Sequence, residues 1–252
     1  MSIPDPLRGK DRLIVALDVS SVDEALRAVE RLSNVNFFKI GLQLFMTGGL
    51  PTLLEALREK QVFVDLKLPG DISNTIAAVV DLCVAQHVAF LTLSGSMPPA
   101  AIRAAKGARD ARRSGSPKLL TVPFVSSLDA GDLAEMAGGR SDLETYVLNL
   151  GRLALDAGCD GIVASGDAIR WCRTAFPGST IIVSPGIRPA GAGADDHKRS
   201  TTPADAIRLG ADYLVVGRPI LKSPDPREAA ERIIREIDAA LDASMPHARS
   251  VL

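Results

Sequence analysis

The sequence has 252 residues, a length that is typical of one α/β-barrel domain and that buries a core without disulfides or structural metals. Its 29 basic and 30 acidic side chains leave a formal net charge of −1, which excludes the strongly positive field of many nucleic-acid-binding proteins. The apolar runs are strand-sized and the first ten residues lack an apolar signal core, so we expect a cytoplasmic protein without a membrane span.

Short apolar runs rich in strand-forming residues recur at fairly even intervals along the chain and predict eight strands. The runs are LIVALD from Leu13, FFKIG from Phe37, VFVDLK from Val62, FLTLS from Phe90, LLTVPF from Leu119, GIVAS from Gly161, TIIVSPG from Thr180 and YLVVG from Tyr213.

Amphipathic stretches with helical spacing separate these runs. They cover residues 22–32, 51–60, 72–85, 99–113, 143–157, 168–176 and 203–209, with a last helix over 226–243. Alternating strands and helices predict a parallel sheet with right-handed crossovers, and eight such units favour a closed barrel over an open doubly wound sheet. We therefore expect the α/β class and a single (β/α)8 TIM barrel over about residues 11–244, followed by a short polar C-terminal tail.

The connection over residues 186–202, GIRPAGAGADDHKRSTT, is long, glycine-rich and basic near its end. We expect it to be a loop that closes over a ligand, because long structureless loops in compact domains are more often functional than idle.

The cysteines Cys83, Cys159 and Cys172 are too few and too scattered for a disulfide framework or a Cys-x-x-Cys metal site. We expect all three to be reduced packing residues.

Charged residues stand at three of the predicted strand ends, where the active site of a barrel lies. Asp18 ends the first run, Lys39 lies in the second, and Asp65 and Lys67 lie two apart in the third, which puts them on one face of that strand. Each could be an ordinary ion pair at the rim. Together, however, alternating lysines and aspartates on neighbouring strands form the arrangement that tolerates removal from water by mutual pairing, and this points to chemistry.

A phosphate site is predicted at the ends of the last two strands. Pro185–Arg188 follows the seventh run and Gly217–Ile220 follows the eighth, so the backbone near Gly217 and the guanidinium groups of Arg188 and Arg218 can meet an anion. Barrels commonly hold phosphate at these two strands.

Seven segments of the chain together resemble the orotidine 5'-phosphate decarboxylase family, which converts orotidine monophosphate into uridine monophosphate and carbon dioxide. They are LIVALDVSS, FFKIGLQLF, VFVDLKLPGDISNT, TVPFVSSLD, DGIVASG, SPGIRPAG and DDHKRSTTPADAIRLGADYLVVGRPI. The third is the most specific, because its Asp-x-Lys followed by Asp-Ile-x-Asn-Thr is tied to the chemistry of the family and not only to its fold.

The resemblance implies a charged array of Lys39, Asp65, Lys67 and Asp71, with Asp71 and Thr75 reaching into the site of a neighbouring subunit in a homodimer. Lys67 is then the group that stabilises and protonates the carbanion, with no cofactor and no metal.

The substrate contacts that the resemblance implies lie elsewhere in the barrel. Asp18 would hold the ribose hydroxyls and Ser127 the pyrimidine, while Arg218 and the backbone around Gly217 would hold the phosphate. Lys39, Thr75 and Arg188 are also expected to contact the substrate. The partners expected are thus a nucleotide and a second copy of the chain, and neither nucleic acid nor a membrane.

Three departures from the family pattern affect single residues. Pro69-Gly70 places Asp71 four residues after Lys67, where three is usual, so the geometry of Asp71 is open. His197 stands where a phosphate-binding glutamine is common, and Ser94 and Ser96 follow the fourth run where a histidine is frequent; none of these three receives a role.

Two alternatives stay open. A magnesium-dependent sugar-phosphate β-keto acid decarboxylase or aldolase of the same superfamily needs an acidic residue at the end of the second strand, where this chain has Lys39. A non-catalytic barrel that binds phosphate ligands would keep Arg218 and lose the interior charges, which this chain retains.

Overall fold

The computed structural model describes residues 7–69, 74–137, 139, 142–189 and 201–244. Within these ranges no helix is both long enough and apolar enough to cross a membrane.

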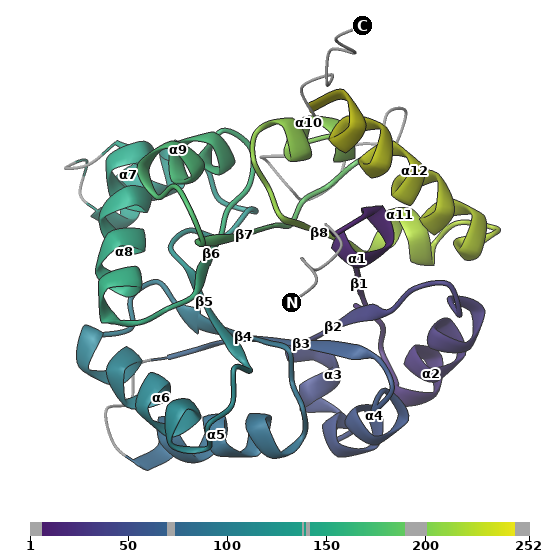
Figure 1. Cartoon of the computed structure of the whole chain (residues 1–252), viewed down its shortest axis with the longest axis horizontal. Coiled ribbons are helices and arrows are strands. Elements are labelled where there is room, and N and C mark those ends of the chain that lie inside the picture. Colours follow the sequence, from purple (N-terminus) through teal and green to yellow (C-terminus); the bar gives the residue numbers. More distant parts are fainter. Residues whose placement is uncertain (1–6, 70–73, 138, 140–141, 190–200, 245–252) are drawn as a thin grey trace, which may run out of the picture.

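Eight parallel strands close into a barrel in the order in which they occur along the chain, as Figure 1 shows from one end. Each predicted run is confirmed as a strand, and the predicted (β/α)8 fold is confirmed by the closed order. The strands are β1 (Leu13–Ala16), β2 (Phe37–Gly41), β3 (Gln61–Leu68), β4 (Phe90–Ser94), β5 (Lys118–Val122), β6 (Gly161–Val163), β7 (Ile181–Ser184) and β8 (Tyr213–Val216).

The helices surround the barrel on its outside (Figure 1). Those predicted from the sequence are α2 (Val22–Arg31), α4 (Leu50–Ala56), α5 (Asn74–Ala85), α6 (Pro99–Ala111), α8 (Leu143–Ala157), α9 (Ala168–Ala175), α10 (Pro203–Arg208) and α12 (Pro226–Ser244). The structure adds short ones, α1 (Gly9–Arg12), α3 (Leu42–Met46), α7 (Ala130–Ala137) and α11 (Arg218–Leu221). Most of these span a turn or two, too short for a periodic apolar pattern to reveal them.

Capping side chains mark where three of the helices begin. Ser21 accepts a hydrogen bond from the Glu24 amide at the start of α2, and Asp142 accepts one from the Thr145 amide at the start of α8. Thr202 does the same for α10. Each cap satisfies a backbone donor that has no partner within its helix.

Large side chains from several strands fill the inside of the barrel. Phe37, Phe63, Phe90 and Tyr213 meet edge to face, with ring centroids 5.0–6.0 Å apart, next to buried aliphatic residues. Side chains on the alternate strand positions, such as Val62 and Val64, pack outwards against the helices. Phe63 inside and Val62 and Val64 outside thus follow the alternation of side chains along a strand.

The three cysteines lie buried in the outer core as free thiols, as predicted. Burial raises the pKa of the Cys83 thiol to about 11 and those of Cys159 and Cys172 to about 12. These thiols therefore remain protonated at neutral pH and pack as small apolar groups.

The aromatic layer generates a prediction about stability. Replacing Phe90, which contacts Phe37, Phe63 and Tyr213, with alanine leaves a cavity that the closed barrel cannot collapse. We expect Phe90→Ala to lower the free energy of unfolding by about 3–5 kcal/mol, measured by chemical denaturation. The control Leu153→Ala, on the exposed face of α8, should change it by less than about 0.5 kcal/mol. Equal losses in the two variants would contradict the prediction.

Candidate active site

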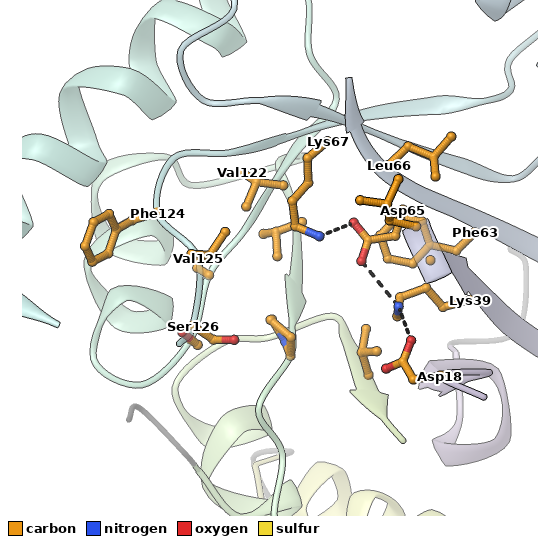
Figure 2. Close-up of a pocket in the computed structure, with 17 residues that line it drawn as sticks. Asp18, Lys39, Phe63, Asp65, Leu66, Lys67, Val122, Phe124, Val125 and Ser126 are labelled. Carbon is orange, nitrogen blue, oxygen red and sulfur yellow. Dashed lines mark hydrogen bonds and ion pairs between the residues drawn. The ribbon is translucent and has the colours of Figure 1, made fainter. Parts of the chain in front are cut away.

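A cavity of about 350 Å³ opens at the carboxyl ends of the strands. Figure 2 shows the charged side chains Asp18, Lys39, Asp65 and Lys67 on one side of it, and the β5 loop with Phe124, Val125 and Ser126 on the other. Charged groups and apolar walls thus face each other across a space large enough for a small organic ligand.

The four charged residues form one alternating chain of contacts. Lys39 Nζ lies 3.0 Å from Asp18 Oδ1 and 3.4 Å from Asp65 Oδ2, and Lys67 Nζ lies 2.9 Å from Asp65 Oδ1 (Figure 2). Each carboxylate therefore meets at least one ammonium, and the Asp65 carboxylate meets two. The structure brings together the four residues that the sequence placed at three different strand ends.

Gly41, at the end of β2, leaves room for this chain of contacts. A Cβ atom at this position would lie 3.1 Å from Lys39 Nζ and 3.4 Å from Asp18 Oδ1. A larger residue would press on the ion pair from the side, so the absence of a side chain here is part of the site.

Burial differs between the inner and outer members of the chain. The side chains of Lys39 and Asp65 are 10% and 14% exposed, whereas those of Lys67 and Asp18 are 42% and 51% exposed. Lys39 and Asp65 therefore form a buried pair that anchors the site. Lys67 and Asp18 keep part of their surface free to contact a ligand in the cavity.

The electrostatics of the buried pair favour the charged forms of both groups. Burial opposes the charge on Lys39, but attraction by Asp65 and Asp18 and hydrogen bonds to both outweigh it, so the pKa of Lys39 is raised. Burial likewise opposes ionisation of Asp65, yet Lys39 and Lys67, with hydrogen bonds from Lys67 and Thr92, hold its pKa below the ordinary value.

An irregularity in β3 sets the positions of Asp65 and Lys67. Val64 pairs with Leu91 of β4, but the next pair joins Leu68 to Leu93, so three residues of β3 face one residue of β4. Lys67 adopts a φ of 47°, the left-handed region, which costs a residue with a Cβ on the order of 1 kcal/mol. This local strain lies beside a polar cavity, a common place for it in proteins.

A smaller pocket of about 70 Å³ adjoins the cavity at the ends of β7 and β8. Gly186, Arg188, Gly217 and Arg218 line it, and Asp18, Lys39 and Val215 line both spaces. Gly186 has a φ of 75°, a conformation that glycine adopts without strain. The anion site that the sequence predicts between these two strand ends stays a prediction, and the structure places there a small pocket that Arg188 and Arg218 line.

Arg188 is held beside this pocket by backbone contacts. Its amide donates to the Thr201 carbonyl at 2.9 Å, and Ile187 forms a bridge with Thr201. The two flanks of the glycine-rich segment thus pair next to this smaller pocket. Most of that segment, including His197, lies outside the described residues.

The structure does not place the other predicted site residues in the cavity lining. Thr75 is exposed near the start of α5, and Asp71 falls outside the described residues. Ser127 is also exposed and is not in the lining, where its neighbour Ser126 lies buried.

Ser94 and Ser96, to which the sequence assigned no role, form a hydrogen bond with each other, with their Oγ atoms 2.8 Å apart.

Sequence reasoning missed three polar residues of the site. Ser126 and Ser165 line the cavity, and Thr92, on the inner face of β4, contacts both Asp65 and the backbone of Lys67. For Thr92 a signal existed, because it lies two residues after the inward-facing Phe90 and shares its face. Nothing in the local sequence distinguishes Ser126 from Ser127.

No group of three or more histidine, cysteine, aspartate or glutamate side chains able to hold a metal ion occurs in the described part of the chain.

The buried pair generates a prediction about pH. In the folded protein the pKa of Asp65 lies below its unfolded value of about 3.9, so the pair stabilises the fold above that pH and is lost as the pH falls through the folded pKa. Lys39→Met removes the strongest attraction, so we expect the Asp65 carboxyl to titrate at higher pH, followed by its ¹³C NMR shift. The control Lys10→Met, on α1, should leave that titration unchanged. A titration of Asp65 at the wild-type pH in Lys39→Met would contradict the assigned cause.

Comparison with known proteins gives a consistent result. Residues 11–233 match the family described as Orotidine 5'-phosphate decarboxylase / HUMPS family. The orotidine 5'-phosphate decarboxylase of Methylococcus capsulatus is 43% identical over 242 residues, which cover 93% of this chain and 96% of that protein. That of Rhodopseudomonas palustris strain BisB5 is 45% identical, covering 95% and 100%.

A solved structure agrees with these sequence relatives. The crystal structure of orotidine 5'-phosphate decarboxylase from Lactobacillus acidophilus is similar with a TM-score of 0.78 and 28% identity, covering 90% of this chain and 98% of that one. The resemblance drawn from the motifs is confirmed: the chain belongs to the orotidine 5'-phosphate decarboxylase / HUMPS family.

Proposed function

We propose that this protein decarboxylates orotidine 5'-phosphate to uridine 5'-phosphate and carbon dioxide, the last step of de novo UMP synthesis, and that it needs neither metal nor cofactor. The observation that carries the proposal is the alternating chain Asp18–Lys39–Asp65–Lys67, which lines a cavity next to a pocket with two arginines. Family membership and the names of the relatives support the same reaction.

Lys67 has the central role in the proposed reaction, because it both stabilises and protonates the carbanion. The bond from C6 of the pyrimidine to the carboxylate breaks, its electron pair stays on C6, and carbon dioxide leaves. The C6 carbanion has no adjacent electron sink, so a fixed ammonium stabilises it by electrostatic attraction and then donates a proton to it. Lys67 is partly exposed to the cavity and its Nζ is oriented by Asp65, which supports this role. Solvent afterwards returns a proton to the amine.

Asp65 has a second role in this proposal. Its carboxylate would lie near the departing carboxylate of the substrate, and the repulsion between the two disfavours the bound ground state relative to the transition state. The lowered pKa of Asp65 keeps its charge in place at neutral pH.

Binding contacts far from C6 complete the site. The phosphate would occupy the pocket of Arg188, Gly217 and Arg218, and the ribose would lie over Asp18 and Lys39, which line both spaces. The pyrimidine would then extend between Lys67 and the β5 loop, where we place the contact with Ser127. The binding energy of these contacts, which lie far from C6, would help to close the site around the substrate and to orient C6 next to Lys67.

The position of Lys39 argues against the magnesium-dependent alternative. A metal ion shared by Asp18 and Asp65 would have to sit between their carboxylates, and the Lys39 ammonium already lies there, 3.0 and 3.4 Å from them. A fixed cation at that point repels a divalent ion.

A homodimer forms part of the proposal. Asp71 and Thr75 would reach into the site of the second subunit from the start of α5. An apolar face on helix α3, formed by Leu42, Phe45 and Met46, is exposed in the single chain, and a second copy would cover it. We place this enzyme in the cytoplasm as one barrel domain, without nucleic-acid or membrane partners.

Turnover tests the reaction. We expect the absorbance of the orotate ring to decay when orotidine monophosphate is added to purified protein in excess chelator, because no step uses a metal. Lys67→Ala should lower kcat by about 10³-fold or more, since it removes both the electrostatic stabiliser and the proton donor. The control Lys106→Ala, on the surface of α6, should retain wild-type turnover. Absence of turnover by the wild type, or turnover that appears only with added magnesium, would overturn the proposal.

Complementation tests the shared site. Lys67→Ala and Asp71→Ala homodimers should each be nearly inactive. After subunit exchange, half of the dimers are mixed and each mixed dimer has one intact site, so about a quarter of the wild-type activity should return. A mixture that stays inactive although mass spectrometry detects mixed dimers would place Asp71 in the site of its own subunit.

A further inference from the structure

Thr92 occupies the one position of β4 that lies opposite the irregularity in β3. Its neighbours Leu91 and Leu93 pair with Val64 and Leu68, so Thr92 alone faces Asp65, Leu66 and Lys67. The residue has no exposed surface. A buried hydroxyl at this point costs free energy unless it is bonded on both its donor and acceptor sides, which is what the structure shows.

The Thr92 hydroxyl connects two parts of the charged chain. The Lys67 amide donates to Thr92 Oγ1 at 2.9 Å, and Thr92 Oγ1 donates to Asp65 Oδ1, also at 2.9 Å. The direction of both bonds is determined, because an amide N–H can only donate and an ionised carboxylate can only accept. Asp65 Oδ1 is therefore linked to Lys67 twice, directly through the ammonium and indirectly through Thr92 and the backbone.

The bond to the amide satisfies a need that the irregular register creates. Lys67 has no partner residue on β4, and a backbone amide beside a buried strand requires an acceptor. Thr92 supplies that acceptor, and its hydroxyl donates a hydrogen bond to the Asp65 carboxylate, so each of the two hydrogen bonds polarises and strengthens the other.

We propose that Thr92 is a positioning residue for the decarboxylation: it holds the backbone of Lys67 in its left-handed conformation and locks the rotation of the Asp65 carboxylate, so that the ammonium is fixed where the carbanion forms. This inference rests on the proposed function, because only the decarboxylation provides the carbanion that the Lys67 ammonium would stabilise. Thr92 itself does not line the cavity and acts only through Asp65 and Lys67.

The contacts of the Asp65 carboxylate show why a fixed rotation matters. Lys39 approaches Oδ2 from β2, Lys67 approaches Oδ1 from the same strand, β3, and Thr92 approaches Oδ1 from β4. Asp18, which follows β1, competes for Lys39. A carboxylate free to turn would exchange its oxygens between two ammonium groups. Small displacements of this kind are costly for a group that must meet a reacting atom.

The experiment compares three variants by steady-state kinetics. Thr92→Val removes the hydroxyl at nearly constant volume, and we expect kcat to fall about 10- to 100-fold while KM stays within about threefold, the effect of losing a hydrogen bond to a charged group. Thr92→Ser keeps donor and acceptor and should stay within about threefold of the wild type. The matched control is Thr121→Val on β5: Thr121 is equally buried, but its Oγ1 has no partner among the described residues, so kcat should change by less than about twofold.

A second readout does not depend on turnover. Thr92→Val removes one of the hydrogen bonds that lower the pKa of Asp65, so the Asp65 carboxyl should titrate at higher pH in the ¹³C NMR spectrum, and the acid limb of kcat should move the same way. Thr92→Ser should restore both. If the wild type does not turn over orotidine monophosphate but Thr92→Val still shifts the titration of Asp65, the decarboxylase proposal is rejected. The contact between Thr92 and Asp65 then still stands.

Three outcomes would overturn the inference. These are an unchanged kcat in Thr92→Val, an equal loss in Thr92→Val and Thr121→Val, and a Thr92→Ser variant as slow as Thr92→Val. If Thr92→Val does not fold, Thr92→Cys decides the question, because a thiol is similar in size and only a weak donor. Wild-type kcat in a folded Thr92→Cys would reject the role, and an intermediate kcat would support it.

Discussion

The site depends on one interaction, the buried ion pair between Lys39 and Asp65. Taking an ammonium and a carboxylate out of water is costly, and a single contact between them rarely compensates for it. The barrel meets this cost with further partners on neighbouring strands: Asp18 from the end of β1, Lys67 from β3 and Thr92 from β4. The pair and its partners hold both groups in their charged forms.

The charged chain divides into a buried pair and two partly exposed members, and the proposed reaction assigns the supporting role to the first and the contacts with substrate to the second. Lys39 and Asp65 form a fixed base, whereas Lys67 and Asp18 rise from it into the cavity, each bonded to one member of the pair. The proposed electrostatic catalysis uses charges that are oriented before the reaction begins, so that no reorganisation would be needed as a carbanion forms. The adjoining pocket, which Arg188 and Arg218 line, shares Asp18 and Lys39 with the cavity, so one ligand could occupy both spaces.

Much of the fold and part of the site were predictable from the sequence, for reasons that particular residues show. Alternation along a strand is a local property, so it assigned Phe63 and Asp65 to the inside of the barrel and Val64 to the outside without knowledge of the neighbours. The short helix α3 could not be predicted, since a helix of that length shows too few turns of apolar periodicity. Ser126 lines the cavity and Ser127 does not. This difference depends on the path of the loop after β5, which no periodic pattern in the sequence describes.

The sequence by itself determined the eight-unit barrel, the family of the chain and the identity of the charged residues at the strand ends. Composition, periodicity and short motifs carry this information because each concerns residues close together in the chain. Only the tertiary structure decided which ammonium meets which carboxylate, how deeply each is buried, and that Thr92 connects Asp65 with Lys67. These features arise from the register between β3 and β4, and a register shift depends on contacts between residues about 25 positions apart, which no local pattern encodes.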